Sequence, residues 1–244
     1  MLQRRFFFPM NSAMLRFIAL TFWLSVFGAQ AGVVIGGTRF IYSASMDALA
    51  VPVNNTSDAS WLINSHVQPA SRWPGAVIQA PNSVPFIITP PLFLLRAKQE
   101  SRLRVVYSGQ GLPGDRESLF TLSIAAIPSG KAESNSVQLA FRQSMKLIYR
   151  PANLAGDPQQ SYQQLHWVLG AEGLEVRNPT PYYVTLFLLH TNEKTIDAAG
   201  VVAPFAVRKT HWCRGALTCH VRWQSINDYG RVMPPLTQDL HYSR

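Results

Sequence analysis

The most informative hydrophobic pattern in this chain runs from Val137 to Arg150. Val137, Leu139 and Phe141 alternate with polar or small residues, the period of a strand with one apolar face. Lys146 then interrupts an otherwise apolar run. Three interpretations are open. The strand can offer its edge and apolar side chains to an incoming strand, its lysine can bind a chain-terminal carboxylate, or it is an ordinary half-buried strand whose lysine reaches water.

Short predicted strands follow one another at close spacing after residue 32. Clusters of Asn, Pro, Gly and Ser separate them, and no segment has the spacing of an amphipathic helix. Seven such strands within about 120 residues predict an immunoglobulin-like sandwich. They are expected in VVIGGTRFIYSA, LAVPVNN, SWLINSHVQ, FIITPPLFLL, SRLRVVYS, SLFTLSIAAI and SVQLAFRQ.

A second series of strands follows a polar segment at residues 153–162. About six strands within roughly 85 residues are enough for a second, smaller sandwich. We therefore predict an all-β protein with two immunoglobulin-like domains, at residues 32–152 and 153–244. The second series is expected in LHWVLGA, LEVRN, YYVTLFLLH, APFAVRK, CHVRWQSI and PPLTQDL.

The first 31 residues differ in composition from the rest of the chain. Their only charges are three arginines, and an almost wholly apolar run from Met14 to Gly28 precedes the small residues of Ala29-Gln30-Ala31. This order is typical of a secretory signal, with cleavage expected after Ala31 and either Met1 or Met14 as the start. The apolar run is short for a membrane span and no later stretch is long enough, so we expect an exported, soluble protein without a membrane anchor.

The chain is basic. Loss of Arg4, Arg5 and Arg16 with the signal would lower its formal charge from +9 to +6. A basic protein suits an acidic partner, but the positive residues are scattered and form no run that could follow a phosphate backbone. We therefore expect no nucleic-acid partner.

Two cysteines, Cys213 and Cys219, have five residues between them. In an oxidising compartment they are expected to form a disulfide that closes a local loop. Redox-active pairs are more often spaced by two residues, and a metal site would need more ligands nearby. His211 and His220 flank the pair, so metal binding is the alternative.

Catalytic motifs are absent from the sequence. It contains no G-x-S-x-G, no H-E-x-x-H and no glycine-rich phosphate loop, and its six histidines lie in different segments. Asp115 and Glu117 are close in sequence, but nothing places them on opposed faces of a cleft, as acid–base catalysis requires. We expect neither an enzyme nor a bound cofactor or metal.

Two cations stand among apolar residues of the first domain. Arg39 lies in its first predicted strand and Lys146 in its last. The first and last strands of a sandwich can lie near each other, and two fixed cations at their junction would suit a carboxylate. The alternative is that each cation pairs with an acid of the same chain.

Six separate motifs make the chain resemble the periplasmic chaperones of pilus (fimbria) assembly, the PapD-like family. The resemblance extends over about residues 36–237 and rests on the whole set of motifs in its order. The motifs are Thr38-Arg39-Phe40-Ile41-Tyr42, Thr89-Pro90-Pro91-Leu92-Phe93, Asp115-Arg116-Glu117-Ser118-Leu119-Phe120, Lys146-Leu147-Ile148-Tyr149-Arg150-Pro151, Asn178-Pro179-Thr180-Pro181-Tyr182-Tyr183-Val184-Thr185 and Ile226-Asn227-Asp228-Tyr229-Gly230.

The resemblance implies two immunoglobulin-like domains set at an angle, with a cleft between them. It also implies a protein that lends a strand to a pilus subunit lacking its own last strand, a form of strand addition established for chaperone–pilin complexes. Here Val137, Leu139 and Phe141 would fill the subunit's groove. Arg39 and Lys146 would bind the subunit's C-terminal carboxylate and thereby fix the register. An outer-membrane usher would receive the complex.

The resemblance assigns further roles. Glu117, Arg150 and Asp228 match the family's interdomain charge network, which would hold the two domains at their angle. The short loop at residues 129–136 is similar to the branch associated with rod-like adhesive pili. Two features depart from the family: His66 stands where tryptophan is common, and the cysteine pair precedes the motif of Asp228.

Two other classes of exported protein are alternatives to this function. An exported two-domain adhesin or carbohydrate-binding protein would share the fold, whereas a pilin would usually be one incomplete domain. An exported hydrolase would need a triad or metal site. In the free chaperone, an exposed apolar edge would favour a self-capping dimer.

Overall fold

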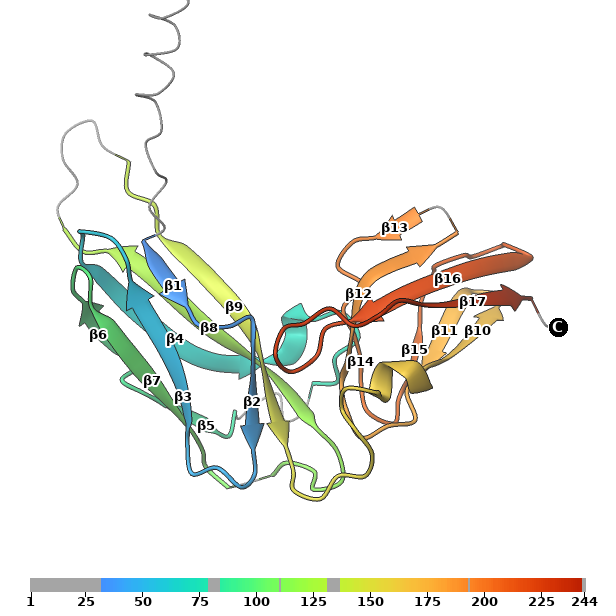
Figure 1. The fold of residues 1–244 in the computed structure, drawn as a ribbon, viewed down its shortest axis with the longest axis horizontal. Helices are drawn as coiled ribbons and strands as arrows, with labels where there is room; N and C mark the ends of the chain where they lie inside the picture. Colours follow the sequence, from blue (N-terminus) through green and yellow to red (C-terminus); the bar gives the residue numbers. More distant parts are fainter. Residues whose placement is uncertain (1–31, 79–83, 110, 131–136, 193, 243–244) are drawn as a thin grey trace, which may run out of the picture.

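The computed structural model describes residues 32–78, 84–109, 111–130, 137–192 and 194–242. Within these residues the chain forms strands and two short 3-10 helices, and no α-helix. The strands make two sandwich domains that meet at an angle (Figure 1). The predicted signal at residues 1–31 and most of the loop before the last strand of domain one lie outside the described residues.

Domain one is a sandwich of two sheets. Because polar and apolar residues alternate along its strands, the apolar set from each sheet faces the other and forms a closed core. The first sheet has the order β1 (Val33–Ile35), β3 (Leu49–Asn55), β7 (Glu100–Tyr107), β5 (Phe86–Thr89). The second has the order β2 (Arg39–Ser43), β9 (Phe141–Arg150), β8 (Ser118–Pro128), β4 (Trp61–Pro69), β6 (Leu92–Leu95).

Two segments expected as single strands are each split between the sheets. The first breaks at Gly36-Gly37, which separates β1 from β2, and a side chain at Gly36 would lie 2.6 Å from the Pro52 ring. The second breaks at Pro90-Pro91, which separates β5 from β6 after a cis Thr89–Pro90 bond. Neither proline can donate a ladder hydrogen bond, so pairing stops there.

Domain two is a smaller sandwich with its own core. Its strands are β10 (His166–Gly170), β11 (Gly173–Arg177) and β15 (Val207–Lys209) in one sheet. The other sheet has the order β13 (Lys194–Ile196), β12 (Val184–Thr191), β16 (Thr218–Ser225), β17 (Leu236–His241), and β14 (Val201–Val202) also pairs with β12. The sequence prediction missed β13 and β14, which are too short to show a period. The 3-10 helix η2 (Ser161–Gln164) precedes β10.

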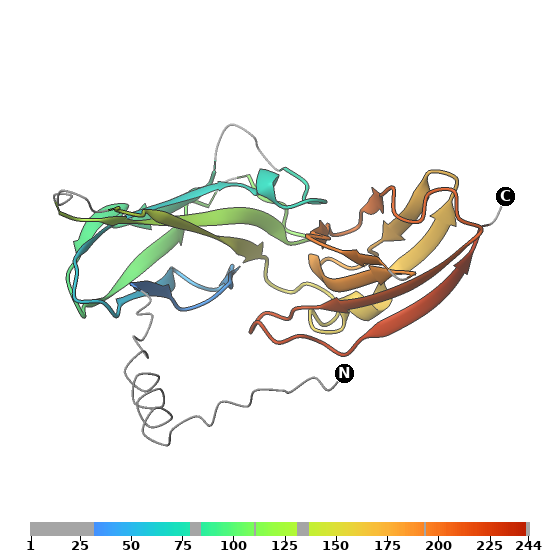
Figure 2. The same cartoon turned by 90° about the horizontal axis from the view of Figure 1, so that it is seen from above.

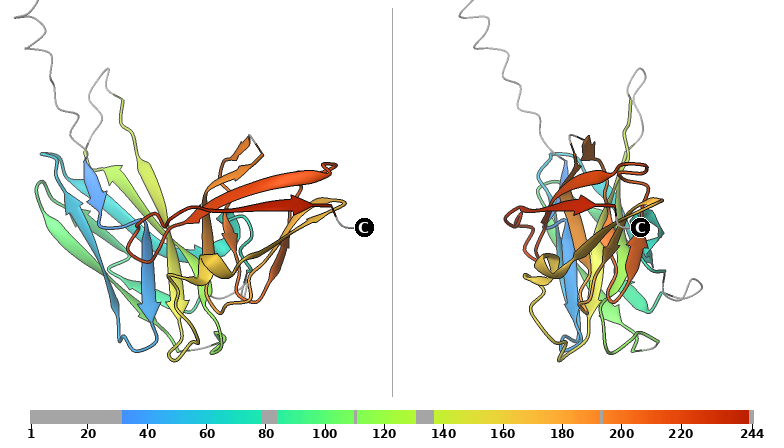
Figure 3. Two further views of the ribbon diagram at one scale, coloured as in Figure 1. Left: turned by 45° about the vertical axis from the view of Figure 1, so that its right-hand side comes forward. Right: turned by 90° about the vertical axis from the view of Figure 1, so that its right-hand side faces the viewer.

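The two domains are joined by a third apolar cluster. It combines Leu119 and Ile148 of domain one with Tyr183 and Val201 of domain two, and Ala70 of the 3-10 helix η1 (Ala70–Arg72) packs into it. Figure 2 and the left view of Figure 3 show the two lobes side by side. None of the described helices is long and apolar enough to cross a membrane.

Candidate functional site

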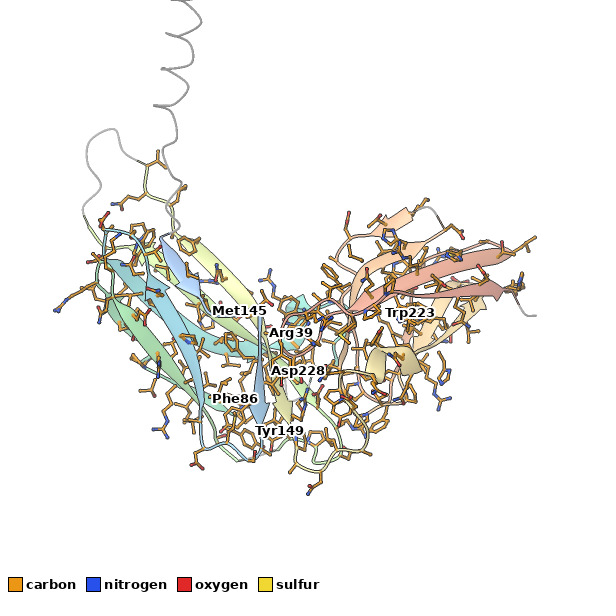
Figure 4. The ribbon with its side chains drawn as sticks, in the orientation of Figure 1. Arg39, Phe86, Met145, Tyr149, Trp223 and Asp228 are labelled. Atoms are coloured by element: carbon orange, nitrogen blue, oxygen red, sulfur yellow. A yellow bond between two sulfur atoms is a disulfide. The ribbon has the colours of Figure 1, made fainter. Side chains whose placement is uncertain are left out.

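The parallel pair of β2 and β9 builds the centre of the site. Arg39 on β2 is the direct partner of Lys146 on β9, so the two cations stand opposite each other at one level of the sheet. The part of the first predicted strand that carries Arg39, now β2, therefore does lie beside the last strand of the domain, as expected. Arg39 lies at the junction of the two lobes (Figure 4).

Domain two holds the Arg39 side chain. One guanidinium nitrogen donates to the carbonyl of Ile226, and the other donates to Thr185 Oγ1 over 3.0 Å. Burial lowers the pKa of Arg39, against smaller opposing effects of Asp228 and Glu117. Since both contacts are with neutral oxygens, Arg39 is fixed in place without losing its net charge to an acid.

The Lys146 ammonium lies 4.0 Å from the centre of the Trp73 ring, in the geometry of a cation–π contact. Burial, and next the charge of Arg39, lower the pKa of Lys146 to about 8. Among the described residues, neither Lys146 nor Arg39 forms an ion pair with an acid. The alternative of internally neutralised cations therefore has no support in the described part of the chain.

One edge of β9 is open beside these cations. β8 pairs with β9 over Phe141 to Tyr149, but β2 pairs with it only from Lys146 onward. Among the described residues, the stretch from Phe141 to Met145 therefore has a strand partner on one side alone. A hollow of about 360 Å³ lies against this stretch, lined by Ile35, Gly37, Thr38, Gln143, Ser144 and Met145.

The three apolar residues expected at this edge have different surroundings. The strand was expected from Val137, but β9 begins at Phe141, and residues 137–140 have no ladder partner in the described part of the chain. Val137 and Leu139 are 85% and 74% exposed. Phe141 is half-buried instead, because its ring packs against the domain core and edge-to-face on Trp61 at 5.4 Å.

Arg150 links Glu117 of its own domain to Asp228 of domain two. Its Nε donates to Glu117 over 2.6 Å, and its two terminal nitrogens donate to Asp228 over 2.7 and 3.0 Å. The second Glu117 oxygen accepts from the backbone N–H of Tyr183 over 2.7 Å. The three residues named from the sequence are thus brought together across the junction.

Burial and the contacts within this network shift the pKa values of its members in opposite directions. Burial raises the pKa of Glu117 to about 7, although Arg150 and the Tyr183 N–H act in the other direction. Burial lowers the pKa of Arg150, but the hydrogen bonds and charges of Asp228 and Glu117 outweigh it, so that the net pKa is raised. Arg150 therefore remains a cation that bridges two carboxyl groups.

Comparison with known proteins gives this geometry a family. The model of "Pili and flagellar-assembly chaperone, PapD N-terminal domain" matches residues 32–155, and that of "Pili assembly chaperone PapD, C-terminal domain" matches residues 160–236. The chain belongs to the PapD family of pilus assembly chaperones. This family is not enzymatic, and its fimbrial members are periplasmic.

Individual relatives align with this chaperone over most of both chains. The uncharacterized fimbrial chaperone YcbF of Escherichia coli K12 is 44% identical, over 86% of this chain and 89% of its own. The chaperone protein FimC of the same strain is 37% identical, over 86% and 85%. A chain in the structure of the Salmonella enterica SafA pilin in complex with the SafB chaperone has a TM-score of 0.72 at 31% identity, covering 86% of this chain and 98% of that one.

The cysteines of the chaperone form a disulfide that joins Cys213, in the loop between β15 and β16, to Cys219 on β16. Cys219 begins the buried face of β16, and Cys213 packs against the domain-two core. No group of three or more His, Cys, Asp or Glu side chains in the described residues could hold a metal ion. His66, the departure noted in the sequence, lies on β4 and contacts Gln68.

The sequence prediction missed three groups at the site of the chaperone. Trp73 faces Lys146, while Thr185 and the carbonyl of Ile226 hold Arg39. Thr185 and Ile226 both stand in motifs that carry the family resemblance, so their segments contain a signal. Trp73 has no such signal in the sequence, because it lies outside every periodic segment and every motif.

Proposed function

We propose that this chaperone binds and caps pilus subunits in the periplasm by donating β9 to them, and that it passes the complex to an outer-membrane usher. The observation that carries the proposal is the position of two cations without an acidic partner in the described chain, Arg39 and Lys146, at the end of the open edge of β9. Usher delivery and the periplasmic location follow from the family and from the predicted signal.

The open edge of β9 supplies the hydrogen bonds. An unpaired strand edge presents backbone N–H and C=O groups that can pair with another strand. A subunit that lacks its last strand has the complementary defect, namely an apolar groove and unpaired backbone groups. Pairing β9 with the subunit covers the open edge of the chaperone and the apolar groove of the subunit, both of which would otherwise promote aggregation. The hollow along Gln143 to Met145 leaves room for the incoming strand.

Apolar side chains supply the affinity. Phe141, Met145 and Leu147 all face the domain core, so Val137 and Leu139 would share their face once this segment is extended and paired. Each could contribute about 1.5–3 kcal/mol if the subunit's groove buried it fully. In the free chaperone their exposure favours a self-capping dimer, which gel filtration can detect.

The cations supply the register. A carboxylate bound at Lys146 fixes the end of a subunit strand lying along Phe141 to Met145, so that strand must run parallel to β9. A slip of one residue would turn every apolar side chain away from the groove. The Glu117–Arg150–Asp228 network would also help to fix the register, because it keeps domain two in place and domain two holds Arg39.

Co-purification from periplasm tests the proposal. Tagged wild type is compared with Lys146→Ala, Arg39→Ala and the matched control Arg104→Ala, which changes an exposed arginine on β7. We expect wild type and the control to retain a small pilin-like subunit, identified by mass, and the two anchor variants to lose it while still folded. Retention of the subunit by both anchor variants would refute the carboxylate anchor, and glycan binding would be tested next.

A further inference from the structure

Residues 70–78 form a strap that runs from the end of β4 across the junction to domain two. The strap begins as η1, where Trp73 N–H donates to Ala70 over 2.9 Å, and continues through a turn in which Ala76 N–H donates to Trp73 over 3.0 Å. The N–H of Val201 in domain two donates to Pro74 over 2.8 Å. Figure 1 shows η1 between the two lobes.

Close backbone approach holds the strap against domain two. A side chain at Gly75 would lie 2.1 Å from the carbonyl oxygen of Val201, and one at Gly200 would lie 2.1 Å from that of Pro74. Both glycines also have positive φ, at +83° and +81°. Only residues without a Cβ allow the two backbones to meet in this way, so the position of the strap is defined by both domains.

The strap places two side chains over β9. Arg72 donates to Ser144 Oγ over 2.8 Å, and the Trp73 ring lies 4.0 Å from the Lys146 ammonium. Ser144 and Lys146 share one face of the strand, since they are two residues apart. The strap therefore covers this face next to the open edge of β9.

We propose that Trp73 is a positioning residue of the subunit-binding site, which holds the Lys146 ammonium ready for a carboxylate. This inference rests on the proposed function, but it assigns a role to a residue that matches none of the family motifs in this sequence. Trp73 acts through Lys146, and the strap connects that action to the position of domain two.

The chemistry favours an aromatic ring in this place. A buried ammonium needs a partner, but an acid at this position would compete with the subunit's carboxylate. A ring face attracts the cation electrostatically and accepts no strong hydrogen bond from it. The N–H groups of the Lys146 ammonium thus remain available for a carboxylate. The ring also restricts the Lys146 side chain, which reduces the entropy lost on binding.

A carboxylate titration tests the contact without any subunit. The probe is acetate, with neutral acetamide as the matched control, at constant ionic strength. The reporter is the Trp73 indole N–H in a ¹H–¹⁵N spectrum, assigned by its absence in Trp73→Phe; this N–H is buried and has no partner among the described residues. We expect acetate to shift the signal in wild type and not in Lys146→Met. An equal shift with acetamide, or no shift with acetate in wild type, would overturn the inference.

Subunit capture tests the role. We expect Trp73→Leu to weaken capture of the subunit that co-purifies with wild type by about 10-fold, and Trp73→Phe, which keeps a ring face, by about 3-fold or less. In a Lys146→Met background, Trp73→Leu should have no further effect, because its partner is gone. If Trp73→Leu reduces subunit capture by the same factor in both backgrounds, Trp73 has a merely structural role and the proposal is wrong. If Lys146→Met itself leaves capture unchanged, the proposed function fails instead.

The strap itself is tested by a matched pair of glycines. Gly75 and Gly109 both have φ of +83°, but a Cβ at Gly109 meets no described atom within 4 Å. Gly75→Ala is therefore expected to abolish the acetate shift of Trp73, while Gly109→Ala, with the same backbone strain, preserves it. If both variants keep the shift, the strap does not position the ring.

Discussion

Arg39 and Lys146 are direct partners in a parallel strand pair, although more than a hundred residues separate them in the chain. Like charges at paired positions repel each other and destabilise a sheet. Among the described residues no acid pairs with either, and burial lowers the pKa of both. An arrangement that costs folding free energy is typical of a binding site, where the missing counter-charge arrives with the ligand.

Replacing Lys146 should stabilise the free chaperone. The pKa of Lys146 is lowered from 10.5 to about 8 in the folded protein, so its charged form is disfavoured there relative to the unfolded chain. Lys146→Met removes this charge and keeps an unbranched side chain of nearly the same length. We expect the free energy of unfolding at pH 7 to rise by about 2 kcal/mol, and this gain to shrink between about pH 8 and pH 10.5.

Urea unfolding of the free protein measures this gain. The control is Lys194→Met, which removes an exposed lysine of β13 and should change stability little. A Lys146→Met protein less stable than wild type at neutral pH would mean that the ammonium is well accommodated in the free chaperone. The same variant should lose subunit capture, so that stability and function change in opposite directions.

Subunit capture should weaken as pH rises through about 8. Only the protonated Lys146 binds a carboxylate, and burial together with Arg39 lowers its pKa to about 8 in the free chaperone. The carboxylate would raise this pKa in the complex, so binding is fully present below the free pKa and is lost progressively above it. The dissociation constant measured from about pH 7 to about pH 9.5 should rise several-fold, and Lys146→Arg should remove this dependence.

The sequence predicted the all-β fold and the contact of the first and last strands, because both follow from alternation and from the closing of a sandwich. It did not predict that the segments around Gly36-Gly37 and Pro90-Pro91 each divide between two sheets. Local alternation tells which face of a strand is buried, but it does not tell which sheet the strand joins. The close packing of Gly36 on Pro52 depends on a contact between two different strands.

The same limit applied at the site. Charged residues that stand among apolar ones, or within motifs, are visible in a sequence. The sequence therefore identified Arg39, Lys146, Glu117, Arg150 and Asp228. Trp73 was missed because it lies outside the strands and its partner Lys146 is distant in the sequence, so nothing in the segment around Trp73 indicates that contact. The three apolar residues before Lys146 were grouped by their spacing, yet the structure separates Phe141 from the other two.

Phe141 should therefore behave differently from Val137 and Leu139. Phe141→Ala removes a ring that packs on Trp61 and on the core, so we expect it to destabilise the free chaperone by about 1–2 kcal/mol as well as to weaken capture. Val137→Ser and Leu139→Ser remove exposed side chains and should weaken capture with almost no loss of stability. Thermal unfolding and co-purification of the three variants separate these effects. Equal stability losses for Phe141→Ala and Leu139→Ser would contradict the packing described here.

The Arg150 network gives the last prediction. Glu117 is buried, so Arg150→Met would leave a carboxyl group without its cation, at a cost of roughly 3 kcal/mol. It would also break the link to Asp228, and we expect domain two to become less fixed, which small-angle X-ray scattering would record as a larger radius of gyration. Asp228→Asn keeps a hydrogen-bond acceptor at a partly exposed position and should cost about 1 kcal/mol.

A double variant separates the loss of the pair from the presence of an unpaired charge. Glu117→Gln combined with Arg150→Met removes both charges, so it should be more stable than Arg150→Met alone, since no buried carboxyl group is left without its cation. The matched control is Arg177→Met, an exposed arginine at the end of β11. If Arg150→Met is no more harmful than this control, the network is not what fixes the domains, and the apolar cluster around Leu119, Ile148 and Tyr183 must hold the junction by itself.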